Sequence, residues 1–297
     1  MSRALVTGAG GFIGRHLVRR LRADGWDVTA PERACADLTD RAALTRAVVA
    51  ARPEAVFHLA AARARSGAQE RADTATVNAL SGVWLVDALP VDCRVVVRLG
   101  SSTEYAAASG PMDERTPLAP RGWFGATKAA GSLLLSAAAD ERGLRSAVLR
   151  AFQVYGPGDH PGRLVPAALR AARDGTVLPL TAPGSRRDWT WVGDVVEACV
   201  LAAGHDRLPT GSVLNLGTGT QTTNEALAAL VGEVSGRPVR VEVGGHPGRS
   251  WDTPDWVCDP TAAREHLGWV PAVGLREGLA RCWAAADSGS PSAAARS

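Results

Sequence analysis

A glycine-rich stretch near the start of the chain constrains the fold more than any other feature. Residues 4–14 read ALVTGAGGFIG, and their first residues predict a short buried strand. Gly8, Gly11 and Gly14 follow, and apolar residues alternating with arginines over 15–24 predict an amphipathic helix. Glycine permits a tight turn and lets the backbone approach a pyrophosphate, whose charge the N–H groups of a helix N-terminus stabilise. Strand, loop and helix in this order predict a dinucleotide-binding site.

Apolar strands and amphipathic helices alternate through the first half of the chain. The predicted strands are 4–6, 27–30, 55–59, 95–99 and 146–150, and the predicted helices are 15–24, 40–51, 74–88 and 125–142. This alternation predicts an α/β protein with a Rossmann-type, doubly wound parallel sheet that binds its ligand at the carboxyl ends of the strands.

The second half is richer in proline and glycine and predicts a smaller C-terminal substrate-binding lobe. Its predicted helices lie near 163–174, 193–203, 223–236 and 273–286. We expect the dinucleotide-binding domain over 1–155 and 188–218, the second lobe over 156–187 and 219–286, and a disordered tail over 287–297.

Composition excludes several classes of protein. The net charge is +3 without a basic block, so nucleic acid is not an expected partner. No apolar run approaches the roughly 20 residues of a membrane span. The N-terminus enters a strand directly, so we expect no signal peptide and a cytoplasmic location. The five cysteines and six histidines are scattered without ligand spacing, which predicts no disulfide and no metal.

The single lysine of the chain is Lys128, because 32 of the 33 basic residues are arginine. A guanidinium does not readily replace a compact ammonium whose pKa can shift. Either a site at Lys128 requires an ammonium group, which we favour, or chance placed the lysine there.

Charged residues follow the second predicted strand, where folds of this kind meet the adenosine ribose. Glu32 favours a free 2′-hydroxyl and Arg33 favours a 2′-phosphate. Arg33 and Arg15 together favour NADP over NAD, although both can equally be solvated surface arginines. Asp37 and Leu38 are placed to contact the adenine.

The next strand ends in small residues, against which a flat cofactor can lie. Leu59, Ala60 and Ala61 are therefore candidate cofactor contacts. His58 lies in an otherwise apolar strand and is interpreted as a satisfied core histidine.

Hydroxyl groups cluster after the strand at 95–99. Ser102 and Thr103 can hydrogen-bond a substrate carbonyl, or the cluster is a polar turn that bonds its own backbone. Further on, Phe124 and Lys128 are four residues apart and share one face of a predicted helix.

At these residues the chain resembles the extended short-chain dehydrogenases/reductases, in the group of nucleotide-sugar epimerases, dehydratases and 4-ketoreductases. The similarity runs from residue 4 to about 283 and covers nearly the whole chain. The matching stretches are TGAGGFIG, HLAA, SSTEY, the segment ending in Lys128, VYGPG, RRDWTWVGDV, NLGTG and WVCDPTAAREHLGWVP.

The resemblance implies a catalytic set of Ser or Thr, Tyr and Lys, in which tyrosine exchanges a proton with the sugar and lysine binds the nicotinamide ribose. Ser102 and Lys128 match this set, whereas Phe124 occupies the tyrosine position. Tyr105 and Glu104 are candidate replacement proton donors. Tyr155 is better interpreted as packed or beside the nicotinamide.

Three explanations for Phe124 follow: an engineered Tyr→Phe variant that traps a substrate complex, a natural enzyme with another acid, or a cofactor-binding pseudoenzyme. The intact surroundings of Phe124 favour the first. Because the family's Thr-Asp-Glu motif is Ser102-Thr103-Glu104 here, dehydration is disfavoured. We expect a 4-ketoreductase acting on a nucleotide-linked 4-keto-6-deoxy sugar; the alternative is an epimerase with tightly bound NAD.

The resemblance also implies the binding residues. Arg187 corresponds to the arginine that pairs with the nucleotide diphosphate, with Arg163 and Arg249 as further candidates, and Gln153 replaces the family's asparagine. Trp251 or Trp256 can stack on a base, although core packing is the better interpretation for most of the nine tryptophans. Ser102 and Thr103 complete the set of expected substrate contacts.

The family further implies a homodimer formed by the helices at 74–88 and 125–142. The expected cofactor contacts are Gly8, Gly11, Phe12, Ile13, Gly14, Arg33, Asp37, Leu38, Leu59, Ala60, Ala61, Lys128 and Val154.

Overall fold

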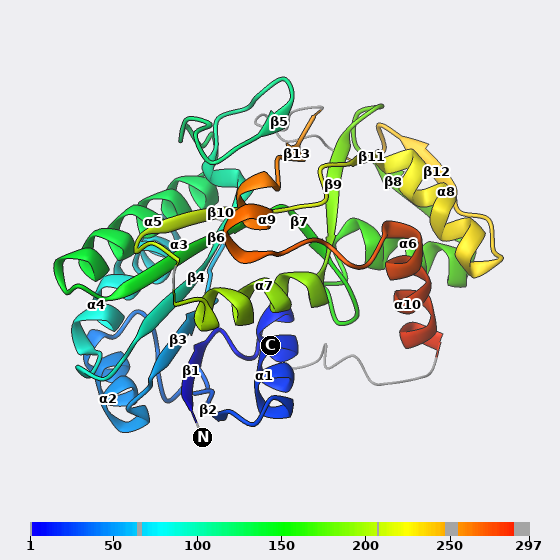
Figure 1. Cartoon of the computed structure of the whole chain (residues 1–297). Helices are drawn as coiled ribbons and strands as arrows, with labels where there is room; N and C mark the ends of the chain where they lie inside the picture. Colours follow the sequence, from blue (N-terminus) through cyan, green and yellow to red (C-terminus); the bar gives the residue numbers. More distant parts are fainter. Residues whose placement is uncertain (1, 64–66, 207, 247–254, 288–297) are drawn as a thin grey trace.

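Six parallel strands form the central sheet of the molecule (Figure 1). The computed structural model describes residues 2–63, 67–206, 208–246 and 255–287. In spatial order the strands are β10 (Ser212–Leu216), β6 (Arg145–Ala151), β4 (Val95–Ser101), β3 (Ala55–His58), β1 (Arg3–Thr7) and β2 (Asp27–Thr29). The sequence predicted all of them except β10. The doubly wound α/β fold is confirmed.

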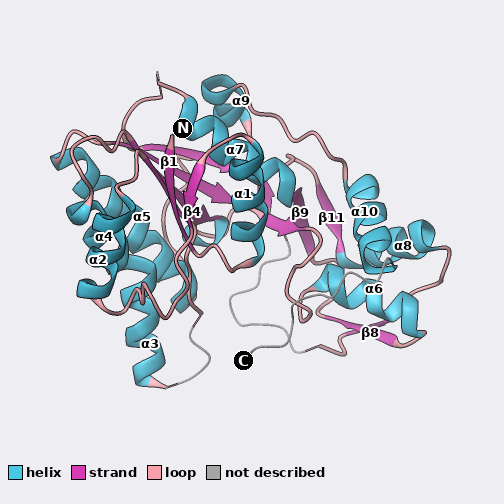
Figure 2. Cartoon of the chain, turned by 90° about the horizontal axis from the view of Figure 1, so that it is seen from below, coloured by secondary structure: helices cyan, strands magenta, loops and turns pink. Residues whose placement is uncertain are grey.

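Helices cover both faces of this sheet (Figures 1 and 2). One face carries α1 (Phe12–Ala23) and α7 (Val192–Gly204), which pack against each other. The other face carries α2 (Arg41–Ala51), α4 (Ser81–Ala88) and α5 (Trp123–Glu141). The helix predicted over 74–88 is interrupted: α3 (Ala68–Ala75) continues into a π-helical turn, η1 (Thr76–Leu80), before α4 begins.

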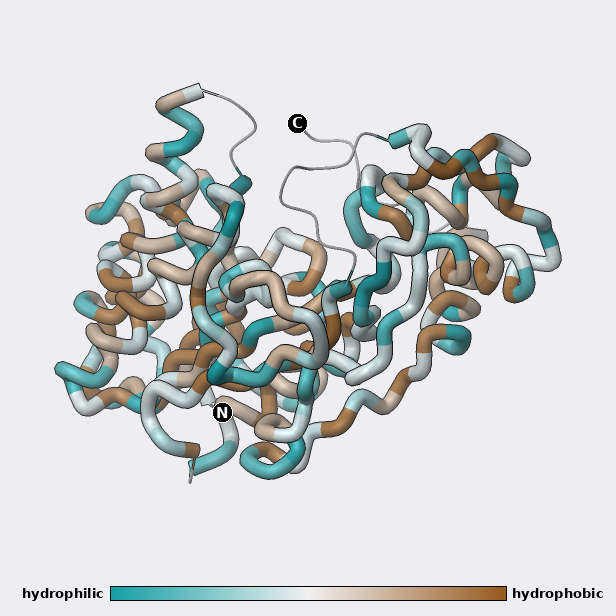
Figure 3. Tube along the Cα trace, turned by 90° about the horizontal axis from the view of Figure 1, so that it is seen from above, coloured by the Kyte–Doolittle hydropathy of each residue, from teal (hydrophilic) through white to brown (hydrophobic). Residues whose placement is uncertain are grey.

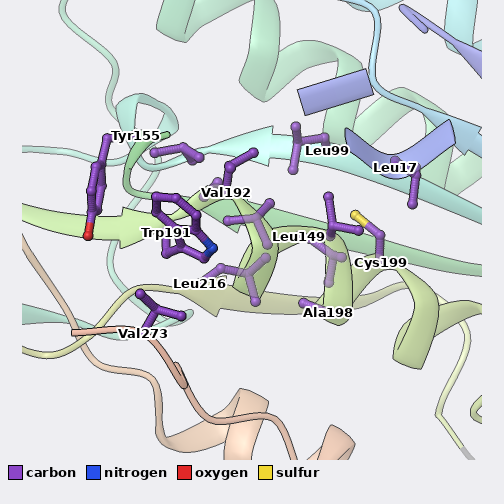
Figure 4. Close-up of a cluster of buried hydrophobic side chains, with 14 of the residues drawn as sticks. Leu17, Leu99, Leu149, Tyr155, Trp191, Val192, Ala198, Cys199, Leu216 and Val273 are labelled. Atoms are coloured by element: carbon purple, nitrogen blue, oxygen red, sulfur yellow. The ribbon is translucent and has the colours of Figure 1, made fainter. Parts of the chain in front are cut away.

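The central strands are buried on both faces, which explains their continuous apolar runs. Figure 4 shows Val192, Ala198 and Cys199 of α7 packed close to Leu99 and Leu149 of β4 and β6. A second cluster fills the space between the sheet and α2, α4 and α5. Figure 3 shows hydrophobic and hydrophilic stretches alternating along the chain in both parts of the molecule.

Smaller sheets and three helices form the C-terminal lobe (Figures 1 and 2). Its strands are β7 (Gln153–Tyr155), β9 (Arg186–Trp191) and β11 (Gln221–Thr223) in one sheet, β8 (Val177–Leu180) with β12 (Arg240–Val243), and β5 (Pro111–Met112) with β13 (Val257–Cys258). Its helices are α6 (Leu164–Asp174), α8 (Asn224–Ser235) and α10 (Leu275–Asp287), while α9 (Thr261–Leu267) packs beside β10. The proposed domain boundaries stay a prediction, and residues 288–297 lie outside the described residues.

The strand order reverses at β1, which has β2 on one side and β3 on the other. Ligands of such sheets bind in the crevice at the carboxyl ends of the strands at this switch point. The glycine loop follows β1, and the small residues 59–61 follow β3, so both predicted motifs meet at this crevice.

In the described part of the chain no helix has the length and apolar character of a membrane span.

Candidate active site

A cleft of about 1930 Å³ runs from the glycine loop along the carboxyl edge of the sheet to the C-terminal lobe. Every cofactor contact expected from the sequence lines it. Of the substrate contacts expected from the sequence, those within the described residues also line the cleft, with the exception of Trp256. Arg249 and Trp251 lie outside the described residues. The cleft therefore brings residues distant in the sequence together in one site.

The glycine loop leaves space for a phosphate because side chains are excluded from it. Gly8 has φ +72°, and a Cβ there would lie 2.6 Å from the backbone nitrogen of Ala60. A Cβ at Gly14 would overlap the carbonyl of Gly8. No side chain caps the first turn of α1, which begins after Gly11 and holds no acidic residue. Its N–H groups and partial positive charge fit a pyrophosphate.

Arginines surround the end of the cleft that would hold the adenosine. Arg15, Arg19, Arg22 and Arg33 all line it. Arg33 is exposed and reaches Asp37 at 3.6 Å. Arg15 instead donates to the carbonyls of Gly10 and Gly158, both at 3.0 Å, so it also braces the glycine loop against the turn after β7.

The hydroxyl of Ser102 is held by a residue that the sequence did not connect with it. Trp256 Nε1 donates to Ser102 Oγ at 2.7 Å. Because that bond occupies a lone pair of Oγ, the Ser102 proton is left for an acceptor in the cleft, such as a carbonyl. Trp256 does not line the cleft, so its predicted stacking on a base is replaced by this positioning contact.

Lys128 lies at the floor of the cleft, where it is almost fully buried and donates from Nζ to the carbonyl of Leu99. Burial first, and the nearby Arg98 charge second, lower the pKa of Lys128 from its ordinary value to about 7. The single lysine of the chain therefore lies buried at the cleft, and its need for an ammonium group stays a prediction.

Asn78 of η1 supports the site from behind the cleft lining, and sequence reasoning missed it. Its side chain accepts from Ala62 N at 2.7 Å, donates to Ala62 O at 2.9 Å and donates to Thr127 Oγ1 at 2.9 Å. It thereby ties the loop after β3 to the helix that carries Lys128. Asn78 lies within the π-helical turn η1, which fixes the position of its side chain. Such turns are frequent at functional sites.

Phe124 lines the cleft one helical turn before Lys128 and has no proton to exchange. The guanidinium carbon of Arg63 lies 4.1 Å from the centroid of its ring, a cation–π contact. The aromatic position is therefore packed against a cation.

The proposed replacement donors are not at the cleft, which corrects the expectation for Tyr105 and Glu104. Tyr105 is buried and donates to Asn215 Oδ1 at 2.7 Å. Glu104 is fully buried, accepts from Ser101 N at 2.8 Å and pairs with Arg150 Nε at 2.9 Å. Neither lines the cleft, because their partners hold them within the fold.

Tyr155 is packed in the fold, which agrees with the first of its two interpretations. Its ring lies against the rings of Trp189 and Trp191, and it does not line the cleft.

His58 is fully buried, and its Nδ1 shares a hydrogen bond with Thr7 Oγ1 at 2.7 Å. Its Nε2 has no hydrogen-bond partner among the described residues, so the ring is only half satisfied.

The C-terminal side of the cleft carries Gln153, Arg163 and Arg187. It also carries Asp159 and His160, which the sequence motifs did not single out although both directly follow VYGPG. Asp159 pairs with Arg163 at 3.5 Å, and burial raises the pKa of its carboxyl group. The two arginines supply the bidentate donors that a diphosphate requires.

The fold and the cleft define a dinucleotide-binding α/β protein with a serine and a lysine at the reactive end. Residues 4–217 match the family described as NAD dependent epimerase/dehydratase. The chain belongs to this family of extended short-chain dehydrogenases/reductases, which comprises nucleotide-sugar epimerases, dehydratases and 4-reductases.

Two relatives and a solved structure illustrate the match. UDP-glucose 4-epimerase of Mycolicibacterium smegmatis is 33% identical over 94% of this chain and 96% of its own. The dTDP-6-deoxy-L-talose 4-dehydrogenase (NAD(P)(+)) of Kitasatospora kifunensis is 32% identical over 96% of this chain and 95% of its own. The structure of Thermus thermophilus UDP-glucose 4-epimerase with NAD has a TM-score of 0.85 at 28% identity, covering 97% and 99% of the two chains.

Proposed function

We propose that the protein is an NADP-dependent nucleotide-sugar 4-ketoreductase, which reduces a 4-keto-6-deoxy sugar on its nucleoside diphosphate. The main support for this proposal is that four arginines line the end of the cleft that would hold the adenosine. Ala30 and Pro31 follow β2 there, and Glu32 and Arg33, which come next, both line the cleft. Four arginines outweigh Glu32 and Asp37 at this end of the cleft, and positive charge beside the ribose accommodates a 2′-phosphate.

A relative supports the reaction type, because its name describes hydride exchange at C4 of a nucleotide-linked 6-deoxy sugar with NAD(P). A nicotinamide bound in the cleft would supply the hydride. Ser102, aligned by Trp256, donates a hydrogen bond to the C4 carbonyl oxygen as negative charge develops there. Lys128 would hold the nicotinamide ribose and add positive charge. Arg187 and Arg163 bind the diphosphate.

The test is cofactor oxidation with a synthetic NDP-4-keto-6-deoxy sugar, followed by absorbance with NADPH and NADH. The proposal expects stoichiometric oxidation that is faster with NADPH, and Arg33→Ala should abolish the preference. Arg46→Ala is the matched control, because Arg46 is exposed on α2 away from the cleft. Interconversion of two NDP-sugars without net cofactor oxidation would overturn the proposal.

That last outcome is the signature of an NDP-sugar epimerase with tightly bound NAD, which is the second candidate. A specific observation favours it: the 33% identical relative that spans almost the whole chain is named as a UDP-glucose 4-epimerase. Incubation with UDP-glucose and product analysis distinguishes the two candidates.

The Phe124→Tyr variant tests whether Phe124 limits turnover. General acid–base assistance is worth about 10²–10⁴-fold, so an engineered or recently lost tyrosine predicts a gain of this order. An unchanged, low rate in both proteins would favour the cofactor-binding pseudoenzyme. An unchanged, high rate would show that another group already supplies the proton.

We also infer a homodimer. Leu80 of η1 and Leu133 and Leu134 of α5 are exposed, and η1 packs against α5. Covering these side chains with a second copy removes apolar surface from water. Sedimentation of the protein, compared with Leu133→Glu, tests this inference.

A further inference from the structure

A fully buried arginine lies behind Lys128. Arg98 of β4 has no exposed surface. Its Nη2 donates to the carbonyl of Asn78 at 2.5 Å, whereas Nε and Nη1 have no hydrogen-bond partner in the described part of the chain. The ion pairs found between described residues do not include Arg98. Burying a guanidinium without an anionic partner is costly, so this charge calls for an explanation.

Arg98 ends a row of polar side chains that crosses the sheet. Thr7, His58 and Arg98 are in register on β1, β3 and β4. In-register neighbours of a parallel sheet point to the same face. Burial, followed by the charges of Arg98 and Lys128, keeps the pKa of His58 well below its usual value. The row therefore holds a neutral ring and one cation that has no ion-pair partner among the described residues. Burial lowers the pKa of the Arg98 guanidinium to about 10, against the opposing effect of the Glu104 charge.

The fold makes room for this cation next to Lys128. A Cβ at Gly131 would overlap the Arg98 guanidinium and the Asn78 carbonyl. Gly131 lies three residues after Lys128 on α5, so both face the same side of the helix. Helix α5 therefore carries Lys128 and, about one turn later, Gly131, whose missing side chain leaves room for the Arg98 guanidinium.

We propose that Lys128 itself exchanges the proton with the substrate oxygen, and that Arg98 is a positioning residue whose fixed charge makes the Lys128 ammonium ready to release it. This inference rests on the proposed function. It assigns the proton to a cleft-lining group where Phe124 has none and where Tyr105, Tyr155 and Glu104 are held away.

The charged and titratable groups facing Lys128 come from several elements. Arg98 on β4 and Arg63 after β3 lower its pKa, and Glu104 at the end of the short helix η2 (Ser102–Glu104) raises it. His58 on β3 is neutral. Because Glu104 is already paired with Arg150, the balance around the ammonium is positive. A pKa of about 7 suits proton transfer in both directions near neutral pH.

The proton and the hydride reach different atoms of the substrate. In reduction, the sugar C4 gains the hydride that a reduced nicotinamide would supply, so a C–H bond of the donor breaks, a C–H bond forms at C4 and the C=O π bond opens toward oxygen. The carbonyl oxygen gains the proton of the ammonium, so one N–H bond breaks and one O–H bond forms. Lys128 is left as a neutral amine and regains a proton from water.

The single lysine permits a direct test. Protein carrying ¹³Cε-lysine should give one lysine signal in the NMR spectrum of the untagged chain, followed from pH 5 to 11 without substrate. We expect it to titrate near neutral pH. In Arg98→Met the midpoint should rise, although only in part because burial remains. Arg145→Met is the matched control: Arg145 is a mostly buried arginine of β6 that bonds the carbonyls of Ala203 and His205, away from the cleft.

Two results would overturn the proposal: a wild-type midpoint at the ordinary value of lysine, or the same midpoint in Arg98→Met and the wild type. Circular dichroism checks folding, and Arg98→Gln replaces Arg98→Met if the latter does not fold. If neither folds, the wild-type midpoint decides.

An activity measurement separates positioning from structural support. The pH profile of kcat should follow the Lys128 titration and shift upward in Arg98→Gln, while Arg98→Lys, which restores the charge, should retain the wild-type profile. Lys128→Met should lose at least 10²-fold in kcat. If Lys128 titrates near neutral pH and its midpoint rises in Arg98→Met, but no NDP-sugar is turned over, the proposed function fails and the effect of Arg98 on Lys128 stands. If Lys128 titrates at its ordinary value and an NDP-sugar is turned over, the proposed function stands and the role of Arg98 fails.

Discussion

At the scale of single residues, the site depends on contacts that orient its polar groups. Ser102 and Trp256 are 154 positions apart, yet the indole fixes the direction of the serine hydroxyl. We predict that Trp256→Phe lowers kcat about fivefold, because losing one hydrogen bond costs about 1 kcal/mol. The KM for the cofactor should not change.

Steady-state kinetics of Trp256→Phe measure this effect, and Trp283→Phe is its control. Trp283 is a partly buried tryptophan of α10 that packs near Arg237 and does not line the cleft. Equal losses in both variants would show that Trp256 only packs.

Residue types and motifs predicted that Ser102, Lys128 and the arginines lie at the binding site, and in the structure they line one cleft. They failed for Glu104 and Tyr105. Those side chains turn into the fold toward Arg150 and Asn215, partners that the sequence gives no means to pair with them.

At the scale of elements, the β1–α1 unit is the most rigidly specified part of the site. We predict that Gly8→Ala abolishes cofactor binding and lowers the free energy of unfolding by at least about 1 kcal/mol, since φ is +72° and the Cβ meets Ala60. Gly10→Ala, whose Cβ would meet nothing within 4 Å, should keep the stability. Cofactor fluorescence titration and urea unfolding measure both; similar losses in the two variants would contradict the prediction.

Most elements followed from periodicity, and the exceptions have physical causes. The helix predicted over 74–88 contains the π-helical turn η1. Such a turn inserts one extra residue into the helix without changing its amino-acid composition, so the sequence pattern there still predicts an uninterrupted helix. β10 was missed because five residues at the sheet edge, two of them only half-buried, give a short signal. Short strands such as β5 and β13 exist only through their pairing across the chain.

At the scale of the whole molecule, burying Lys128 links folding to pH. The pKa of Lys128 is about 7 in the folded protein, against the ordinary value of 10.5 that applies to the unfolded chain. Between these values the unfolded chain binds more protons, so the Lys128 contribution to the free energy of unfolding rises with pH. Below pH 7 both states are protonated, and the full cost of the buried charge applies.

Comparison with Lys128→Met isolates this contribution. Buried thiols such as Cys199, whose pKa burial raises to about 12, act in the opposite direction but are common to both proteins. We predict that the stability of the wild type relative to Lys128→Met increases by about 1 kcal/mol per pH unit between pH 7 and 10. Urea unfolding at a series of pH values measures the difference. A constant difference would mean that Lys128 stays charged in the folded protein, and the whole fold would then tolerate two neighbouring buried cations.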